Sequence, residues 1–166
     1  MIKFILIFFL GFLSTPLYAE NTLQEPKGNV VFSVAGNITN TNIDSQALFD
    51  LPMLLSLEQH VIVTDTPWIE GANKFEGPLL RDIIDFVGGQ GSSVIATALN
   101  GYKVTIPYQD MIDYPVILAL KQDDNFLSIR KRGPGWVIYP WSDNRSLQNN
   151  QYYTRSIWQL KKLEIK

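Results

Sequence analysis

The sequence predicts an α+β fold, with a mixed or mostly antiparallel β-sheet and a few short helices. Three observations lead to this class. Short runs of β-branched and aromatic residues recur along the chain, and turn-forming residues separate them. Residues 79–87 have apolar spacing near 3.6, as an amphipathic helix requires. The dipeptide Asn100-Gly101 lies between two strand-like runs and is a strong hairpin signal.

Local patterns assign the remaining elements. Strands are expected at 29–36, 58–64, 92–99, 102–106, 116–120 and 137–139, with one or two closing strands over 152–166. Besides the helix at 79–87, which the glycine-rich segment 88–91 ends, short helices are expected at 46–49 and 107–111. Loops or turns are expected at 65–78, 121–125 and 142–151.

The first nineteen residues have the layout of a secretory signal peptide. Lys3 supplies a positive start, residues 4–13 are almost entirely apolar, and Ala19 places a small residue at the expected cleavage site. The apolar run is too short to span a bilayer as a stable helix, and an uncleaved anchor is the alternative. We therefore expect cleavage after residue 19, a single domain over 20–166, a periplasmic location and no stable membrane insertion.

Charge and cysteine content restrict the classes of function. The 166 residues include 14 Lys and Arg against 16 Asp and Glu, and a mildly acidic chain is not expected to bind nucleic acid. Because there is no cysteine, thiolate chemistry and cysteine-bound metals are excluded. The one histidine, His60, is expected on a strand surface and not as a ligand. No Ser-His-Asp or Cys-His arrangement is indicated, and no catalytic residue is assigned.

The segment 130–141 combines cations, glycines and aromatic residues. Its glycines let the backbone approach something flat, and its prolines limit how far the segment flexes. Trp136 and Tyr139 are candidate stacking surfaces, and Arg130 and Arg132 are candidate donors to a ring carbonyl. The alternative is a surface hairpin whose aromatic side chains complete the core.

The expected loop 65–78 offers a third aromatic plate and two acids. Trp68 can stack on a planar ring, and Asp65 or Glu70 can accept from the adjacent N–H groups of an amino-pyrimidinone edge. Stacking would contribute about 1–3 kcal/mol per ring face, by analogy with nucleic-acid bases. The alternative is an Ω-like loop that covers the end of a sheet, with Trp68 as its own small core.

Five segments together resemble the molybdopterin-binding domain of the sulfite oxidase family, and the resemblance covers nearly the whole mature chain. They are 75–83, 100–107, 115–119, 133–140 and 156–158. The resemblance implies that domain's fold. With it, the candidate ligand-binding residues are Asp65, Trp68, Glu70, Arg130, Arg132, Gly133, Trp136, Tyr139, Arg155 and Ser156.

The chain departs from that family at the metal. The family's enzymes hold molybdenum through a cysteine after the strand that here ends at Thr64, and this chain continues Asp65-Thr66 instead. Trp136 stands where the enzymes place an arginine in the Gly-x-Pro segment. The chain thus looks like the small periplasmic members of this fold, which bind a free pterin without molybdenum. The resemblance also implies a partner, the periplasmic sensing region of a membrane diguanylate cyclase or phosphodiesterase that handles cyclic-di-GMP.

Two alternatives to a pterin-binding sensor stay open. One is an oxidoreductase that holds a molybdenum cofactor without a cysteine. The other is a structural or protein-interaction domain that binds no small molecule.

Overall fold

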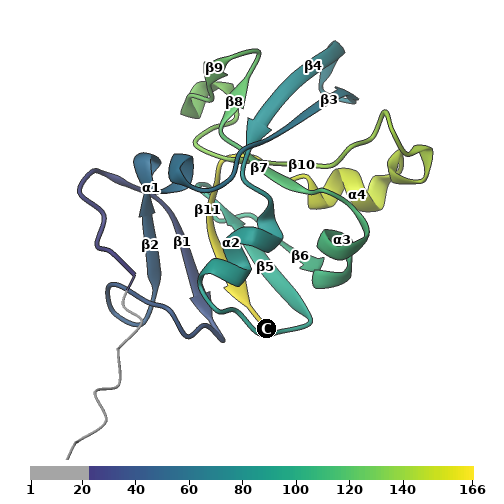
Figure 1. The fold of residues 1–166 in the computed structure, drawn as a ribbon. Helices are drawn as coiled ribbons and strands as arrows, with labels where there is room; N and C mark the ends of the chain where they lie inside the picture. The colour runs from purple at the N-terminus through teal and green to yellow at the C-terminus, as the bar shows by residue number, and fades with distance from the viewer. Residues whose placement is uncertain (1–22) are drawn as a thin grey trace, which may run out of the picture.

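Three β-sheets form the frame of the protein in the computed structural model (Figure 1). The structure describes residues 23–166, and the expected signal peptide, residues 1–19, lies outside the described residues. The predicted α+β class is confirmed, since many short strands alternate with four short helices in this part of the chain. The five-stranded sheet has the order β2-β1-β11-β5-β6, the four-stranded sheet β3-β4-β8-β9, and the third sheet pairs β10 with β7.

The five-stranded sheet joins the two ends of the described chain. Its strands are β1 (Val30–Gly36), β2 (Ala47–Asp50), β5 (Ser93–Ala98), β6 (Lys103–Pro107) and β11 (Leu160–Ile165). The central pair, β1 and β11, runs parallel, and the other pairs are antiparallel. As the Asn-Gly signal predicts, β5 and β6 form a hairpin across Asn100-Gly101.

The four-stranded sheet has one buried and one solvated face. It consists of β3 (His60–Thr66), β4 (Ile69–Gly77), β8 (Lys121–Gln122) and β9 (Asn125–Phe126). Along β3, Ile62 and Thr64 are buried while Val61 and Val63 are exposed, which is the period-two pattern of a sheet with one face in water.

The third sheet, called the central sheet below, is fully buried between the other two. Its strands are β7 (Ile117–Ala119) and β10 (Trp136–Ile138), and every residue of both is buried. A Cβ on Gly77 of β4 would lie 1.9 Å from the Leu118 carbonyl oxygen, so only glycine allows β4 and β7 to approach this closely.

Short helices cover the sheets. They are α1 (Leu51–Ser56), α2 (Leu80–Phe86), α3 (Tyr108–Asp113) and α4 (Asn150–Arg155), with single 3₁₀ turns at Ile129–Lys131 and Arg145–Leu147. The predicted amphipathic helix is confirmed as α2, which buries Leu80, Ile83 and Ile84. Within residues 23–166, no helix has the length and apolar character needed to cross a bilayer.

Three local assignments were wrong. Residues 47–50 form strand β2, because Ala47 and Phe49 are buried by pairing with β1; the helix begins one residue later, with Asp50 as its N-cap. Residues 65–78 are mostly strand, because β4 pairs with β3 and leaves only Pro67 and Trp68 as a tight turn. Residues 150–155 form helix α4, since the Asn149 side chain caps it by accepting from the N–H of Gln151.

Candidate functional site: an aromatic pocket

An open pocket of about 470 Å³ lies where three distant parts of the chain meet. The β3–β4 turn supplies Trp68, the β5–β6 hairpin supplies one side, and α4 with the segment after it supplies the other. The lining residues are Trp68, Ala98, Asn100, Tyr102, Asn150, Tyr153, Thr154, Ser156, Ile157 and Trp158.

Aromatic side chains form the wall of the pocket. The ring of Trp68 lies 5.5 Å from that of Trp158 and 5.9 Å from that of Tyr153, in both cases edge to face. Behind it, the Trp136 ring is 5.7 Å away and the Trp141 ring 5.9 Å away. Such pairs contribute about 0.5–1.5 kcal/mol each beyond their buried area, so Trp68 is held in one orientation. Trp158 is 39% exposed and offers a free ring surface.

The polar groups of the pocket are neutral. None of the described residues that line it is charged. Asn100 accepts a hydrogen bond from the N–H of Tyr102 at 3.0 Å, which orients its amide at the rim. Ser156 donates from its hydroxyl to the Tyr152 carbonyl at 2.7 Å, so it serves as wall. Asn150 is exposed on the first turn of α4. The site can therefore hold a flat ring by stacking and by amide hydrogen bonds, without ion pairing.

Three of the expected site residues are brought together here. Trp68 and Ser156 line the pocket. Arg132 braces the wall from behind: its guanidinium donates to the Trp68 carbonyl at 3.3 Å and lies 5.0 Å from the Trp136 ring centroid and 5.8 Å from that of Trp158. Arg132 thus holds the aromatic wall, and it does not line the pocket.

Trp136 and Tyr139 are core residues, contrary to the expectation that they stack on a ligand. Both are fully buried. The Trp136 indole N–H donates to the Ser156 carbonyl at 3.0 Å, and the Tyr139 hydroxyl donates to Asp110 at 2.8 Å. Because other side chains of the core surround both rings, neither presents a face to a ligand. For these two residues the structure agrees with the alternative, in which the aromatic side chains complete the core.

Arg155 belongs to a buried polar network and does not line the pocket. Its guanidinium donates to both carboxylate oxygens of Asp110, at 3.0 and 2.8 Å, and Tyr139 donates to the same carboxylate. Burial, and secondly the negative charge of Asp110, raise the pKa of Tyr139 above its ordinary value. The tyrosine therefore stays protonated as a donor.

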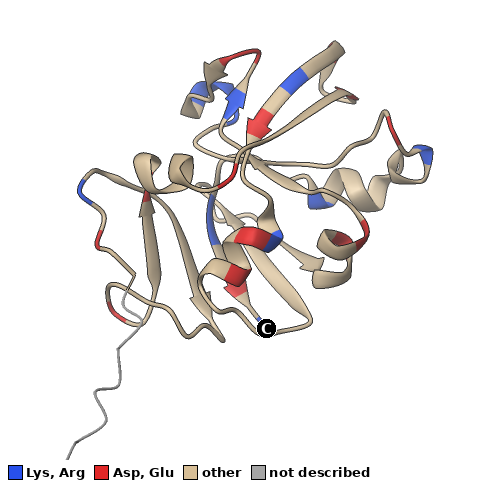
Figure 2. Ribbon diagram, viewed as in Figure 1, with Lys and Arg blue, Asp and Glu red and all other residues tan. Residues whose placement is uncertain are grey.

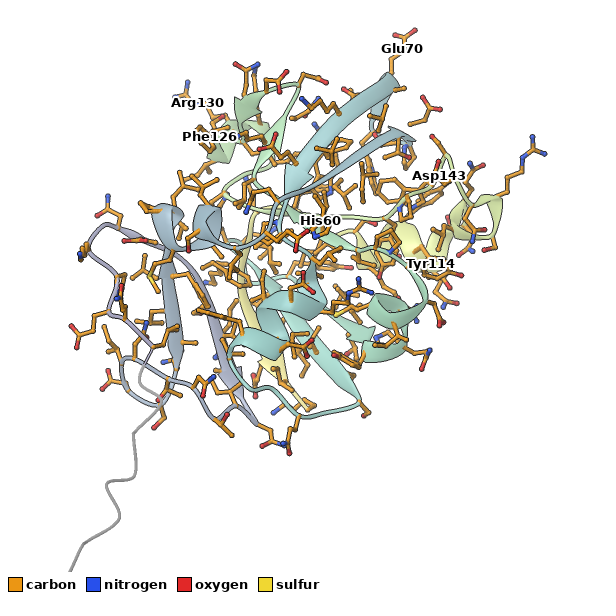
Figure 3. All side chains as sticks on the ribbon, in the orientation of Figure 1. His60, Glu70, Tyr114, Phe126, Arg130 and Asp143 are labelled. Atoms are coloured by element: carbon orange, nitrogen blue, oxygen red, sulfur yellow. The ribbon has the colours of Figure 1, made fainter. Side chains whose placement is uncertain are left out.

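The other four expected residues lie away from the pocket. Glu70 points into solvent at the tip of the β3–β4 hairpin, whereas Arg130 lies beside Phe126 at the β9 edge of the sheet (Figure 3). Asp65 is exposed on β3, where its N–H donates to the Ser142 hydroxyl at 2.9 Å. Gly133 is buried, and a Cβ there would lie 2.1 Å from the Leu127 carbonyl oxygen. Gly133 therefore allows its backbone to pack closely against that of Leu127, and it does not bring the backbone close to a ligand.

Sequence reasoning identified only Trp68 and Ser156 among the ten residues that line the pocket. Asn100, Tyr102 and Trp158 belong to segments that carried the family resemblance, so a signal was present, but their proximity to Trp68 follows only from the fold. Asn150 and Tyr153 were placed in a loop and a strand. Their Asn149-capped helix brings both to the pocket.

Comparisons with known proteins identify the fold alone. No family model matches the sequence, and no curated protein matches it. Among solved structures, the sulfane dehydrogenase SoxCD from Paracoccus pantotrophus matches with a TM-score of 0.59 and 15% identity. The match covers 81% of this chain and 37% of that chain, so this protein spans about a third of its neighbour's length. The fold is of the sulfite oxidase molybdopterin-domain type, a likeness that extends to the fold and not to the activity.

The molybdenum centre that this fold implies does not fit the residues present. The sequence has no cysteine to supply a thiolate. The strand that was expected to end at Thr64 continues to Thr66 as β3. Thr64 is buried, and its hydroxyl is engaged with Ser142, accepting from the Ser142 N–H at 2.9 Å. Residues 23–166 contain no group of three His, Cys, Asp or Glu side chains placed to hold a metal ion.

Proposed function

We propose that this protein is a periplasmic pterin-binding sensor that regulates a partner membrane enzyme of cyclic-di-GMP metabolism, and is not itself an enzyme. The observation that carries the proposal is the neutral aromatic pocket beside Trp68 and Trp158. Its volume of about 470 Å³ lies within the ~300–1,000 Å³ of ordinary small-molecule sites.

The chemistry of the pocket matches a pterin ring better than a phosphate ester. Trp158 and Tyr102, 39% and 48% exposed, supply surfaces on which a flat heterocycle stacks. The amides of Asn100 and Asn150 each combine a donor with an acceptor, as the amino-pyrimidinone edge of a pterin does. A phosphate would require a cation, and no Lys or Arg lines the pocket among the described residues.

The regulatory part of the proposal rests on the family resemblance and on the lack of catalytic groups at the pocket. No acid, base or nucleophile activated by a neighbouring base lines it within the described chain. A binding site without reactive groups suits a protein that reports on its ligand through a partner.

Binding is tested by titrating the protein, purified from cells expressing the full chain, with oxidised and reduced pterins while tryptophan fluorescence is followed. A ring stacked on Trp158 quenches the indole. Trp158→Leu removes one stacking face, about 1–3 kcal/mol, so we expect the dissociation constant to rise about 5- to 150-fold.

Phe126→Leu is the matched control, because Phe126 is 52% exposed on β9 and does not line the pocket. An absence of quenching with every pterin, together with no pterin in native mass spectra of the purified protein, would refute the binding proposal. Molybdenum in the purified protein would favour the oxidoreductase instead.

Signalling is tested separately by co-expressing the full chain with a membrane diguanylate cyclase or phosphodiesterase that has a periplasmic sensing region. We expect cellular cyclic-di-GMP to change with the wild-type chain and not with Trp158→Leu. If the wild-type chain binds pterin but gives the same cyclic-di-GMP level as Trp158→Leu, the regulatory role is rejected and the binding proposal stands.

A further inference from the structure

The β3 edge of the four-stranded sheet is open. In the order β3-β4-β8-β9, strand β3 pairs with β4 on one side only (Figure 1). With seven residues, β3 is the longest edge strand of the described sheets, since β6 has five, β2 four and β9 two. A long open edge is a template on which another strand can pair.

The features that usually protect an edge are confined to the last residues of β3, where the register with β4 shifts between Thr64 and Thr66 around the charged Asp65. The edge strand β6 carries Lys103 and ends at Pro107, and both residues hinder pairing. Strand β3 contains no Lys, Arg or Pro, and its ribbon has no blue segment in Figure 2. Only its end is covered, where the N–H of Asp65 donates to Ser142.

Hydrogen bonds of β4 show which backbone groups of β3 face outward. Glu76 and Lys74 lie opposite Val61 and Val63, and their carbonyls accept from Leu120 and Asp123, away from β3. In an antiparallel ladder, residues opposite such positions direct their own N–H and C=O groups to the other side. Val61 and Val63 therefore present both backbone groups to the free edge.

The side chains of the same two residues are exposed apolar groups. Val61 is 54% and Val63 57% exposed on the solvated face of the sheet. The stretch thus offers four unpaired backbone groups and two β-branched side chains, which is what a pairing strand uses for affinity.

We propose that β3 pairs antiparallel with β3 of a second copy of this chain, about a two-fold axis at Ile62. This register places Val61 opposite Val63 of the second copy, and the reverse, so that each pair exchanges two backbone hydrogen bonds. Four valines then form one apolar row on the outer face of an eight-stranded sheet.

Self-complementarity is the reason for choosing a second copy over another protein. The paired stretch in this register is 60–64, because the N–H of Asp65 is already bonded to Ser142. His60 then lies opposite Thr64, and no like charges face each other. A shift of two residues places either Val61 opposite Asp65 or Val63 opposite Gln59, and it keeps one valine pair in place of two. One short strand from each copy is a small contact beside the ~1,600 Å² of standard interfaces, so the dimer is weak and depends on concentration.

Sedimentation equilibrium of the purified full-length product tests the association. We expect a monomer–dimer equilibrium whose association constant falls at least tenfold in Val63→Lys, because the lysine places a charge on the shared row. Thr105→Lys is the matched control on the exposed face of edge strand β6 and should leave association unchanged. A monomer at every concentration, or a dimer unaffected by Val63→Lys, would overturn the proposal.

Cross-linking tests the register without relying on a charged variant. The chain has no native cysteine, so Val61→Cys and Val63→Cys each introduce a single thiol. The register predicts that an equal mixture of the two proteins, treated with a short bis-maleimide, gives at least threefold more covalent dimer than either protein alone. Equal yields from all three samples would overturn the proposed pairing.

Discussion

The substitution Tyr139→Phe tests how much the buried network contributes to stability. It removes one hydroxyl whose hydrogen bond to Asp110 is 2.8 Å long and fully buried, while the ring keeps its contacts with Tyr152 at 5.4 Å and Trp141 at 6.2 Å. Asp110 retains its two bonds from Arg155, so no buried charge is left unpaired.

The expected loss follows from these contacts. A hydrogen bond to a charged acceptor contributes about 1.5–3 kcal/mol, and a 2 kcal/mol loss lowers Tm by about 4–8 °C in a domain of this size. Asp110→Asn removes the charge that Arg155 faces and should cost about 3–5 kcal/mol. Because both changes act on one network, the double variant should lose less than the sum of the two losses.

The pH dependence provides an independent readout. Since the fold raises the pKa of Tyr139 above its ordinary value of 10.0, the folded hydroxyl stays protonated while the unfolded one ionises near pH 10. Its contribution is complete below pH 10 and declines as the pH rises beyond it, by up to about 1.4 kcal/mol per pH unit. Tyr139→Phe should therefore lose stability less steeply in alkali.

Urea unfolding followed by circular dichroism, from pH 7 to 11, measures the free energy of unfolding of each variant and its dependence on pH. Tyr102→Phe is the control, since Tyr102 is 48% exposed, and it should change stability by less than about 0.5 kcal/mol. The reasoning is refuted if Tyr139→Phe matches the wild type at pH 7 and shows the same alkaline slope.

Two further predictions concern single residues. Gly77→Ala forces a Cβ to within 1.9 Å of the Leu118 carbonyl and should cost more than about 3 kcal/mol, whereas Gly71→Ala, with open space at a φ of +76°, should cost about 1–2 kcal/mol in thermal unfolding. Backbone N–H groups of Met53, Gly28 and Lys27 bond to the Asp50 carboxylate and hold its pKa below 3.8. Its stabilisation is present above pH 4 and fades as the pH falls below it. Asp50→Asn should therefore show a shallower acid unfolding curve, and an unchanged curve would contradict this account.

Elements with strong local signals could be predicted from the sequence. Residues 80–86 form a helix because their apolar spacing suits no other element, and Asn100-Gly101 forms a hairpin because its backbone conformation favours that turn. A helix was expected at 46–49, but helix α1 begins at Leu51. Residue type does not decide between these positions, because Pro52 can follow the end of one helix or lie in the first turn of the next. Pairing of β2 with β1 decides between these, and it is not local.

The roles of Trp136 and Tyr139 could not be settled by residue type, because the same rings suit a core and a ligand plate. A pattern was nevertheless available. The run from Trp136 to Trp141 is apolar without alternation, which is typical of a strand buried on both faces. Trp158, between the buried Ile157 and Gln159, offered no comparable pattern, and its exposure follows only from the fold.

The position of the pocket explains how a bound ring could alter the fold around it. Trp158 forms a β-bridge with Trp136 of the central sheet, and the next residue, Gln159, donates from its N–H to the Arg132 carbonyl at 2.9 Å. Arg132 in turn holds the Trp68 carbonyl on the β3–β4 turn. A ligand stacked on Trp158 therefore contacts a residue bonded to the central sheet and, through Arg132, to the tip of the four-stranded sheet. Under the proposed function, we expect ordering of the Trp158 ring to be transmitted to both sheets through these bonds.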